Sequence, residues 1–157
     1  MKILVLFLGK TDKQYIKEGI DDYVKRIGFY LPFEMKVIPD LKNSSNLSED
    51  LQKEKEGQLI LEQVNKGDQL ILLDERGTEY SSVEFSRWIE KKMITGIRQL
   101  VFAVGGPYGF SEAVYQRADH KISLSRLTFS HQMVRMIFVE QLYRSMTIIK
   151  NEPYHHE

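Results

Sequence analysis

A buried strand that runs directly into a glycine-rich turn constrains this chain more than any other feature. Residues 100–104 read Leu-Val-Phe-Ala-Val, an apolar run that is typical of a strand buried on both faces. The glycines Gly105, Gly106 and Gly109 follow at once, with Pro107 among them. Glycines at such a place let a ligand approach the backbone closely, and ligands of open α/β sheets bind at the carboxyl ends of strands. The turn is therefore either a ligand site or a tight structural turn, and the residues alone leave both open.

Segments of strand type and helix type alternate along the whole chain. Apolar runs predict strands at residues 2–8, 33–38, 69–73, 99–104 and 120–124. Helical periodicity and capping residues predict helices at residues 11–26, 48–65, from 81 to before Gly96, 111–118 and 131–150. This alternation predicts an α/β fold with a mostly parallel sheet and helices on both of its faces. At 157 residues, we expect a single domain over residues 1–157.

Local signals predict where several of these elements begin and end. Thr11 or Asp12 is suited to cap the first helix, and Ser130 the last one. Ser81 and Glu84 have the spacing of a capping box. The sequence Asp-Glu-Arg-Gly at residues 74–77 is expected to end the third strand. The charged run at residues 49–56 fits a solvated helix face better than a partner surface.

Composition excludes several classes of protein. The chain has no cysteine, which excludes disulfides, thiolate metal sites and a cysteine nucleophile, and which fits a cytoplasmic location. No apolar run is long enough to cross a membrane, and we expect no membrane partner. Lys plus Arg and Asp plus Glu both number 22, so no global field attracts nucleic acid. All four histidines follow residue 119, near several arginines, and this indicates a locally basic carboxyl-terminal end.

Three segments resemble known functional motifs only in part. Gly9-Lys10-Thr11 looks like the end of a phosphate-binding loop, but Leu4 stands where that loop needs a glycine. The glycine turn is not a dinucleotide fingerprint, because Pro107 stands at its third place. No cluster has metal-ligand spacing, and we expect no metal; the terminal His155-His156 pair reads as a fortuitous chelator or a tag. No pattern supports a covalent nucleophile.

The segment at residues 124–131 and the helix after it carry the remaining polar candidates. The segment offers backbone groups and apolar surface that suit a purine ring, or it is an ordinary connection. On the helix, His131 and Arg135 share a face, whereas Arg144 lies roughly opposite to Arg135. Arg144 can pair with Glu140, four residues before it. If both arginines bind something, a second surface such as a subunit contact is needed.

Three patterns in order give the chain a family resemblance. They are Val-Gly-Gly-Pro-Tyr-Gly at 104–109, Leu-Ser-Arg-Leu-Thr-Phe-Ser-His at 124–131, and Tyr143-Arg144 followed by Asn-Glu-Pro-Tyr-His at 151–155. Over essentially its whole length, the chain resembles the H family of ribosomal RNA large subunit methyltransferases, which are knotted SPOUT methyltransferases. The resemblance implies a carboxyl-terminal trefoil knot and a homodimer. It also implies that S-adenosylmethionine is bound and that N3 of a pseudouridine in 23S ribosomal RNA is methylated.

The resemblance also implies the residues of the site. The cofactor-binding residues would be Leu73, Gly105, Leu124, Ser125, Arg126, Leu127, Thr128 and Phe129, with Arg126 contributing through its backbone. Methyl transfer to a nitrogen is mostly a positioning task, which a base or a donor to the anion assists. The candidates for binding the target or assisting that step are His131, Arg144, Tyr154 and His155.

The neutral net charge bears on the substrate and on the alternatives. Phosphate contacts dominate the affinity for naked RNA, so we expect the substrate to be the assembled ribosome rather than free RNA. The alternatives are a non-catalytic ribosome-binding protein of the same fold and a phosphate-binding enzyme that uses Gly9-Lys10-Thr11. Binding of S-adenosylmethionine would distinguish the methyltransferase from the non-catalytic ribosome-binding protein. Replacement of Lys10 by Ala would abolish the activity of the phosphate-binding enzyme and leave methyl transfer largely intact.

Overall fold

Five parallel strands form the central sheet of this computed structural model, which describes residues 1–42 and 44–156. The strand order is β2-β1-β4-β3-β5, so β1, β4 and β3 occupy the middle and β5 lies at one edge. The strands are β1 Lys2–Leu8, β2 Phe33–Ile38, β3 Gln69–Glu79, β4 Gln99–Val104 and β5 His120–Ser123. The predicted parallel sheet is confirmed, and so are the bounds predicted for β1, β2 and β4.

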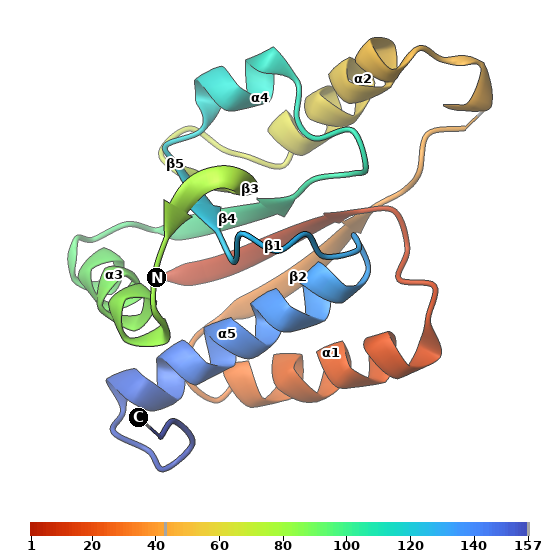
Figure 1. Cartoon of the computed structure of the whole chain (residues 1–157). Coiled ribbons are helices and arrows are strands. Elements are labelled where there is room, and N and C mark those ends of the chain that lie inside the picture. Colours follow the sequence, from red (N-terminus) through yellow and green to blue (C-terminus); the bar gives the residue numbers. More distant parts are fainter. Residues whose placement is uncertain (43, 157) are drawn as a thin grey trace.

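Helices cover both faces of this sheet, as the alternation of elements predicts. They are α1 Gln14–Ile27, α2 Glu49–Leu61, α3 Ser82–Ile94, α4 Glu112–Arg117 and α5 Met133–Ile149, with a short 3₁₀ helix, η1, at Ser44–Asn46. On one face α5 packs between α1 and α3, and on the other face α2 packs against α4 (Figure 1). The result is a three-layer α/β structure.

Strand β1 shows how the sequence builds two cores, one on each side of the sheet. Its side chains alternate between the faces, as in any strand. Ile3, Val5 and Phe7 enter the core beneath α1, α3 and α5, whereas Leu4 and Leu6 enter the core beneath α2 and α4. All five are buried, which explains why this strand reads as a continuous apolar run.

The register of the sheet aligns residues near the carboxyl ends of four strands. Phe7 of β1 pairs with Val104 of β4, and Val104 pairs with Leu73 of β3. Leu73 pairs in turn with Ile122 of β5. The backbone that follows this row therefore leaves the sheet along one common edge, and the glycine turn after Val104 is part of it.

Strand β3 is longer than the sequence predicts. We expected it to end at residues 74–77, but the strand continues to Glu79 through an irregularity. Leu73 and Thr78 both pair with Ile122, so residues 74–77 bulge out of the ladder between them. A β-carbon on Gly77 would lie 2.5 Å from the backbone of Ile122, so only glycine fits where the strand returns.

The predicted cap of the first helix is wrong. Helix α1 begins at Gln14 rather than residue 11, and neither Thr11 nor Asp12 caps it; the N-cap residue is Lys13, without a side-chain bond. The reason lies in α5 and the residues just before it. The hydroxyl of Thr11 accepts a hydrogen bond from Arg135, 3.2 Å away, and the amide of Asp12 donates to the side chain of Gln132, 2.9 Å away.

Other helix ends agree more closely with the prediction. The Ser81–Glu84 capping box is present and starts α3. Ser48 caps α2, which ends at Leu61 instead of 65 because residues 62–65 turn back toward Asp68. Helix α5 begins at Met133, two residues later than predicted, and its N-cap residue is Gln132, so the predicted Ser130 cap is wrong. The Ser130 hydroxyl nevertheless accepts a hydrogen bond from the Met133 amide at 3.2 Å.

The bulge in β3 gives a test of the fold. We expect Gly77→Ala to lower the free energy of unfolding by about 2 kcal/mol, because the added methyl group must push against backbone atoms. Urea denaturation followed by circular dichroism measures this change.

Gly28→Ala is the matched control. A β-carbon on Gly28 would lie 3.4 Å from the Lys25 carbonyl oxygen, an ordinary contact distance, and Gly28 has a helical φ of −57°. We expect this substitution to change the free energy of unfolding by less than about 1 kcal/mol. Equal losses in the two variants would contradict the close approach at Gly77.

Candidate functional site

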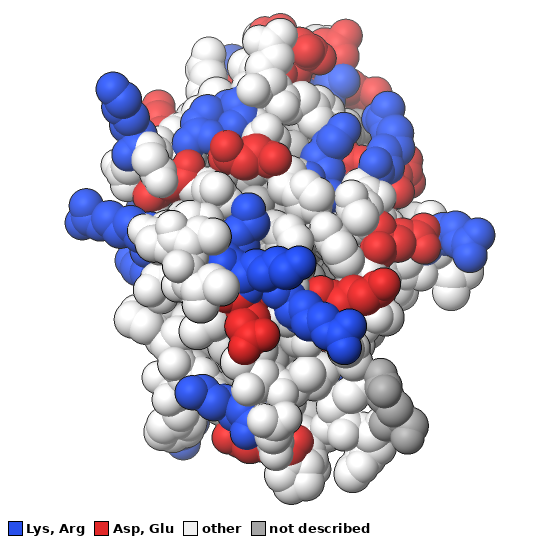
Figure 2. Space-filling view, turned by 90° about the vertical axis from the view of Figure 1, so that its left-hand side faces the viewer, with Lys and Arg blue, Asp and Glu red and all other residues white. Residues whose placement is uncertain are grey.

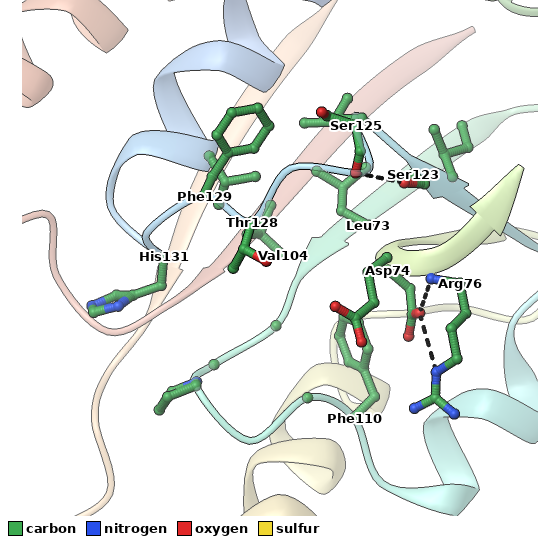
Figure 3. A pocket seen from close by; sticks show the side chains of 18 of the residues that line it. Leu73, Asp74, Arg76, Val104, Phe110, Ser123, Ser125, Thr128, Phe129 and His131 are labelled. Atoms are coloured by element: carbon green, nitrogen blue, oxygen red, sulfur yellow. Dashed lines mark hydrogen bonds and ion pairs between the residues drawn. The ribbon is translucent and has the colours of Figure 1, made fainter. Parts of the chain in front are cut away.

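A cavity of about 570 Å³ opens at the carboxyl ends of β3, β4 and β5 (Figure 3). Its walls come from three segments: the bulge after Leu73, the glycine turn after Val104, and the loop between β5 and α5. The lining residues of these segments include Leu73, Asp74, Arg76, Gly105, Gly106, Pro107, Gly109, Leu124, Ser125, Leu127, Thr128, Phe129 and His131. The cavity therefore offers apolar side chains together with backbone and side-chain polar groups to one ligand.

The glycine turn serves both of the roles that its sequence left open. It is a tight turn, in which the Gly109 amide donates to the Gly106 carbonyl at 3.2 Å and Gly109 has a φ of +80°. It is also a wall of the cavity, where Gly105 presents bare backbone. A β-carbon on Gly105 would lie 3.1 Å from the Phe110 ring, so a larger residue there would have to displace that ring by a few tenths of an ångström.

The bulge contributes a buried carboxylate that the sequence reasoning missed. The side chain of Asp74 is only 7% exposed, and it accepts hydrogen bonds from the Arg76 amide and the Tyr115 hydroxyl. Burial, together with the bond to Asp74, raises the pKa of Tyr115 to about 12. Tyr115 is thus a neutral donor, and Asp74 shapes the bulge. The polar run directly after a buried strand was the available signal, but it was interpreted only as the end of a strand.

The loop between β5 and α5 folds over the cavity and is held by its own serines. The Ser123 hydroxyl donates to the Ser125 carbonyl at 3.1 Å, and the Ser125 hydroxyl accepts from the Leu127 amide at 2.9 Å. Seven of the eight residues expected to bind the cofactor line the cavity. The exception is Arg126, whose side chain is 90% exposed and lies 3.7 Å from Glu79 in an ion pair outside the cavity.

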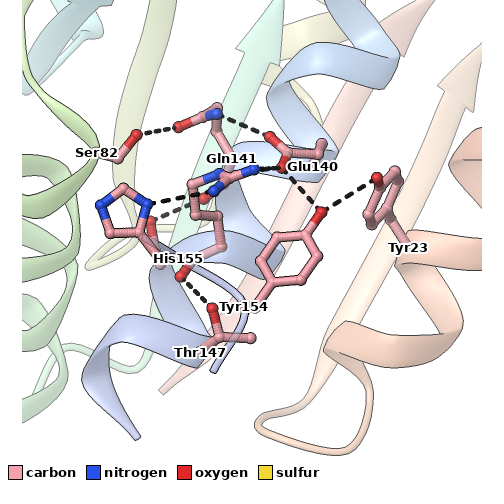
Figure 4. Close-up of polar contacts among 9 residues, drawn as sticks. Tyr23, Ser82, Glu140, Gln141, Thr147, Tyr154 and His155 are labelled. Atoms are coloured by element: carbon pink, nitrogen blue, oxygen red, sulfur yellow. Dashed lines mark hydrogen bonds and ion pairs between the residues drawn. The ribbon is translucent and has the colours of Figure 1, made fainter. Parts of the chain in front are cut away.

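The other candidates gather in a second cluster near the carboxyl end of α5 (Figure 4). We call Glu140, Arg144, Tyr154 and His155 the tail cluster. The guanidinium of Arg144 donates to Glu140 at 2.6 and 3.0 Å, which confirms the predicted pair. It also lies 3.2 Å from the Nδ1 atom of His155 and 4.7 Å from the centre of the Tyr154 ring.

Tyrosines from α1 and from the segment after it hold the tail against α5. Tyr154 donates to Glu140 at 3.1 Å and lies 3.3 Å from the hydroxyl of Tyr23, while Tyr30 donates to Glu152. The Tyr154 ring also packs edge-on against Tyr143, with the ring centres 4.8 Å apart. Burial, with the bond to Tyr23, raises the pKa of Tyr154, so its hydroxyl remains protonated. Residues 152–155 are therefore held against α1 and α5.

The structure separates the four candidate catalytic residues into two groups. His131 lines the cavity just before α5 begins, whereas Arg144, Tyr154 and His155 lie near the other end of that helix. Since a helix rises about 1.5 Å per residue, the groups are roughly 20 Å apart. Within one chain they cannot contact the same small group.

Charge is mixed on the face of the molecule that Figure 2 shows, which is the left-hand side of Figure 1. Lys and Arg side chains gather near the middle of this face, with Asp and Glu side chains beside them (Figure 2). Opposite charges also pair directly in the structure, as Arg117 and Asp119 do at 3.0 Å. Across residues 1–42 and 44–156, no group of three or more His, Asp or Glu side chains is placed to hold a metal ion. In the same residues, no helix has the length and apolar character needed to span a membrane.

Comparisons with known proteins place the chain in a family. A family model described as "Predicted SPOUT methyltransferase" matches residues 1–155. The chain is 62% identical to a protein of Parabacteroides distasonis, 57% identical to one of Flavobacterium johnsoniae and 56% identical to one of Phocaeicola vulgatus. Each of these relatives is named "Ribosomal RNA large subunit methyltransferase H", and each match covers 100% of both chains. The chain therefore belongs to the SPOUT methyltransferase family.

Proposed function

We propose that this chain is an enzyme that uses S-adenosylmethionine to methylate N3 of a pseudouridine in 23S ribosomal RNA. The observation that carries the proposal is the cavity at the strand ends. Its three walls contain Leu73, Gly105 and most of the loop at residues 124–129, which are the segments that the family resemblance assigns to the cofactor. The names of the relatives support the same class of reaction and substrate.

The residues around the cavity fit S-adenosylmethionine. A volume of about 570 Å³ lies within the range of small-molecule sites. The bare backbone of Gly105 and the loop residues Leu124–Phe129 would hold the nucleoside part, with the Phe129 ring and Leu73 as apolar contacts. When bound, this cofactor supplies a methyl group that is already activated, which fits a site that needs no nucleophile or metal.

The tail cluster is suited to the acceptor half of the reaction. N3 of a pseudouridine carries a proton that must leave before or as the methyl group arrives, and the ring then holds negative charge. The Arg144 guanidinium can stabilise that charge, and the protonated hydroxyl of Tyr154 can donate a hydrogen bond to the ring. His155 at one end and His131 at the other can accept the proton. The tail already holds these groups in place, so little conformational entropy is lost in positioning them for the reaction.

The distance between the two groups favours a homodimer. His131 of one protomer and Arg144 of the same protomer are too far apart to act on one base, so the second group must come from another copy. Helix α5 offers a surface for that contact, since Ile137 and Ile148 recur with Arg144 on its outward side and remain only half-buried. A helix that is apolar on both sides is expected to be covered on both.

We further propose the assembled ribosome as the substrate and, with it, a cytoplasmic location. The net charge of zero gives a small chain little hold on naked RNA. Equal rates on protein-free RNA and on assembled ribosomes would contradict this part of the proposal. The family match over residues 1–155 supports one domain over residues 1–157, and the trefoil knot stays a prediction.

Two residues of the same loop test the cofactor site. We expect Phe129→Ala to weaken the binding of S-adenosylmethionine about tenfold, a loss near 1.4 kcal/mol, because an aromatic wall of the cavity is lost. Arg126→Ala should bind the cofactor as the wild type does, since its side chain lies outside the cavity. Isothermal titration calorimetry measures both. A wild type that does not bind at millimolar concentrations would contradict the proposal and favour a non-catalytic ribosome-binding protein.

Mixing two inactive variants tests the homodimer. We expect His131→Ala and Arg144→Ala each to lose most of the methyl-transfer activity on ribosomes. After the two proteins are unfolded together and refolded, mixed dimers should regain part of it, because one of their two sites then carries neither substitution. Transfer of a radioactive methyl group to ribosomes measures the recovery. No recovery in a mixture whose dimers have exchanged, as shown by native mass spectrometry, would argue against a shared site.

A further inference from the structure

A buried arginine near the start of α5 takes no part in the function proposed so far. Arg135 is 2% exposed and is the largest of the fully buried side chains. No carboxylate lies within hydrogen-bond distance of its guanidinium among the described residues; Asp12 and Asp40 act only at longer range. A buried cation without a bonded carboxylate is costly, and a place in the first turn of a helix, at the positive end of its dipole, adds to that cost.

The guanidinium instead bonds to oxygen atoms of two segments that are far apart in the sequence. Its Nη atoms donate to the carbonyls of Leu8 and Gly9, at 2.8 Å for Gly9, and to the Thr11 hydroxyl. Its Nε atom donates to the carbonyl of His131 at 3.1 Å. One planar group therefore joins the turn after β1 to the residue that ends the cavity loop. The five donors of arginine, held in a fixed plane, make such a junction possible.

Gln132 joins the same two segments a second time, at the surface. Its side-chain oxygen accepts from the Asp12 amide at 2.9 Å, and its amide group donates to the Lys10 carbonyl at 3.1 Å. These bonds account for the turn at Gly9-Lys10-Thr11, which resembles a phosphate loop in sequence. Its carbonyl groups point to Arg135 and Gln132, so the turn serves as the support to which the cavity loop is fixed.

We propose that Arg135, assisted by Gln132, is a positioning residue that fixes His131 and the end of the cavity loop to the turn after β1 and so prepares the site for S-adenosylmethionine. This inference rests on the proposed function for its ligand, but the junction itself is a property of the chain without ligand. Loss of the junction leaves the cavity loop anchored mainly through β5.

The main test is Arg135→Lys, with Arg117→Lys as the matched control. Lysine keeps the positive charge but lacks the planar guanidinium group with its several donors, so it cannot bond to the carbonyls of Gly9 and His131 at the same time. Arg117 also donates to a backbone carbonyl, that of Asp68 at 2.8 Å, but before the start of β3, at the other end of the sheet. Calorimetry should show about tenfold weaker binding of S-adenosylmethionine by Arg135→Lys and unchanged binding by Arg117→Lys.

Two further readouts separate positioning from a general loss of stability. In NMR spectra of the free protein, the ring signal of His131, assigned with His131→Gln, should shift in Arg135→Lys while that of His120 stays in place. On ribosomes, the kcat and the KM for S-adenosylmethionine should change, and the KM for ribosomes should not. A ring signal and an affinity that both match the wild type would overturn the inference.

Gln132→Leu keeps the inference testable if Arg135→Lys does not fold. This variant removes the surface junction without leaving a buried charge unpaired, and it should weaken cofactor binding about threefold, the loss expected for hydrogen bonds at an exposed site. Unchanged binding in this variant would overturn the inference in that case. A wild type that binds no cofactor would overturn the proposed function, and the His131 ring signal would still decide whether the junction positions the loop.

Discussion

The parallel pairing of β4 between β1 and β3 is the constraint on which the rest of this structure depends. It places Phe7, Val104, Leu73 and, through β3, Ile122 in one row across the sheet. The segments that follow these residues therefore meet at the same edge of the sheet. The turn after β1, the bulge in β3, the glycine turn and the cavity loop are brought together by this register, although they lie far apart in the sequence. The cavity is thus a consequence of strand pairing.

Helix α5 separates the polar residues beside the cavity from those of the tail cluster. Just before its first turn His131 lines the cavity, and Arg135 within that turn bonds to the carbonyls of Leu8 and Gly9. Glu140 and Arg144 of the helix form the tail cluster together with Tyr154 and His155, which follow it. A rigid helix keeps these groups apart, so a reaction that needs both ends needs two copies of the chain. Under the proposed function, this arrangement would let a small chain with one sheet and no net charge enclose a cofactor and present a second set of polar groups to a base.

The sequence predicts the elements well but the polar contacts between them poorly. Three strands have the predicted bounds because continuous apolar runs leave few alternatives, and the Ser81–Glu84 capping box is purely local. Thr11 was expected to cap a helix, but a partner 124 residues away uses its hydroxyl. The polar run that begins at Asp74 predicts the end of a strand. The bulge that forms there depends on the pairing of Thr78 with Ile122 of β5, which the local sequence does not indicate. Contacts between residues that are far apart in the sequence leave no local pattern in the chain.

The proposed function requires the cavity and the tail cluster to act together in methylating one pseudouridine of ribosomal RNA. Mass mapping of 23S ribosomal RNA from cells that lack this chain is a direct test. We expect one pseudouridine to have lost a single methyl group at N3, and purified protein with S-adenosylmethionine to restore it on ribosomes from those cells. Identical maps from cells with and without the chain would contradict the proposed function.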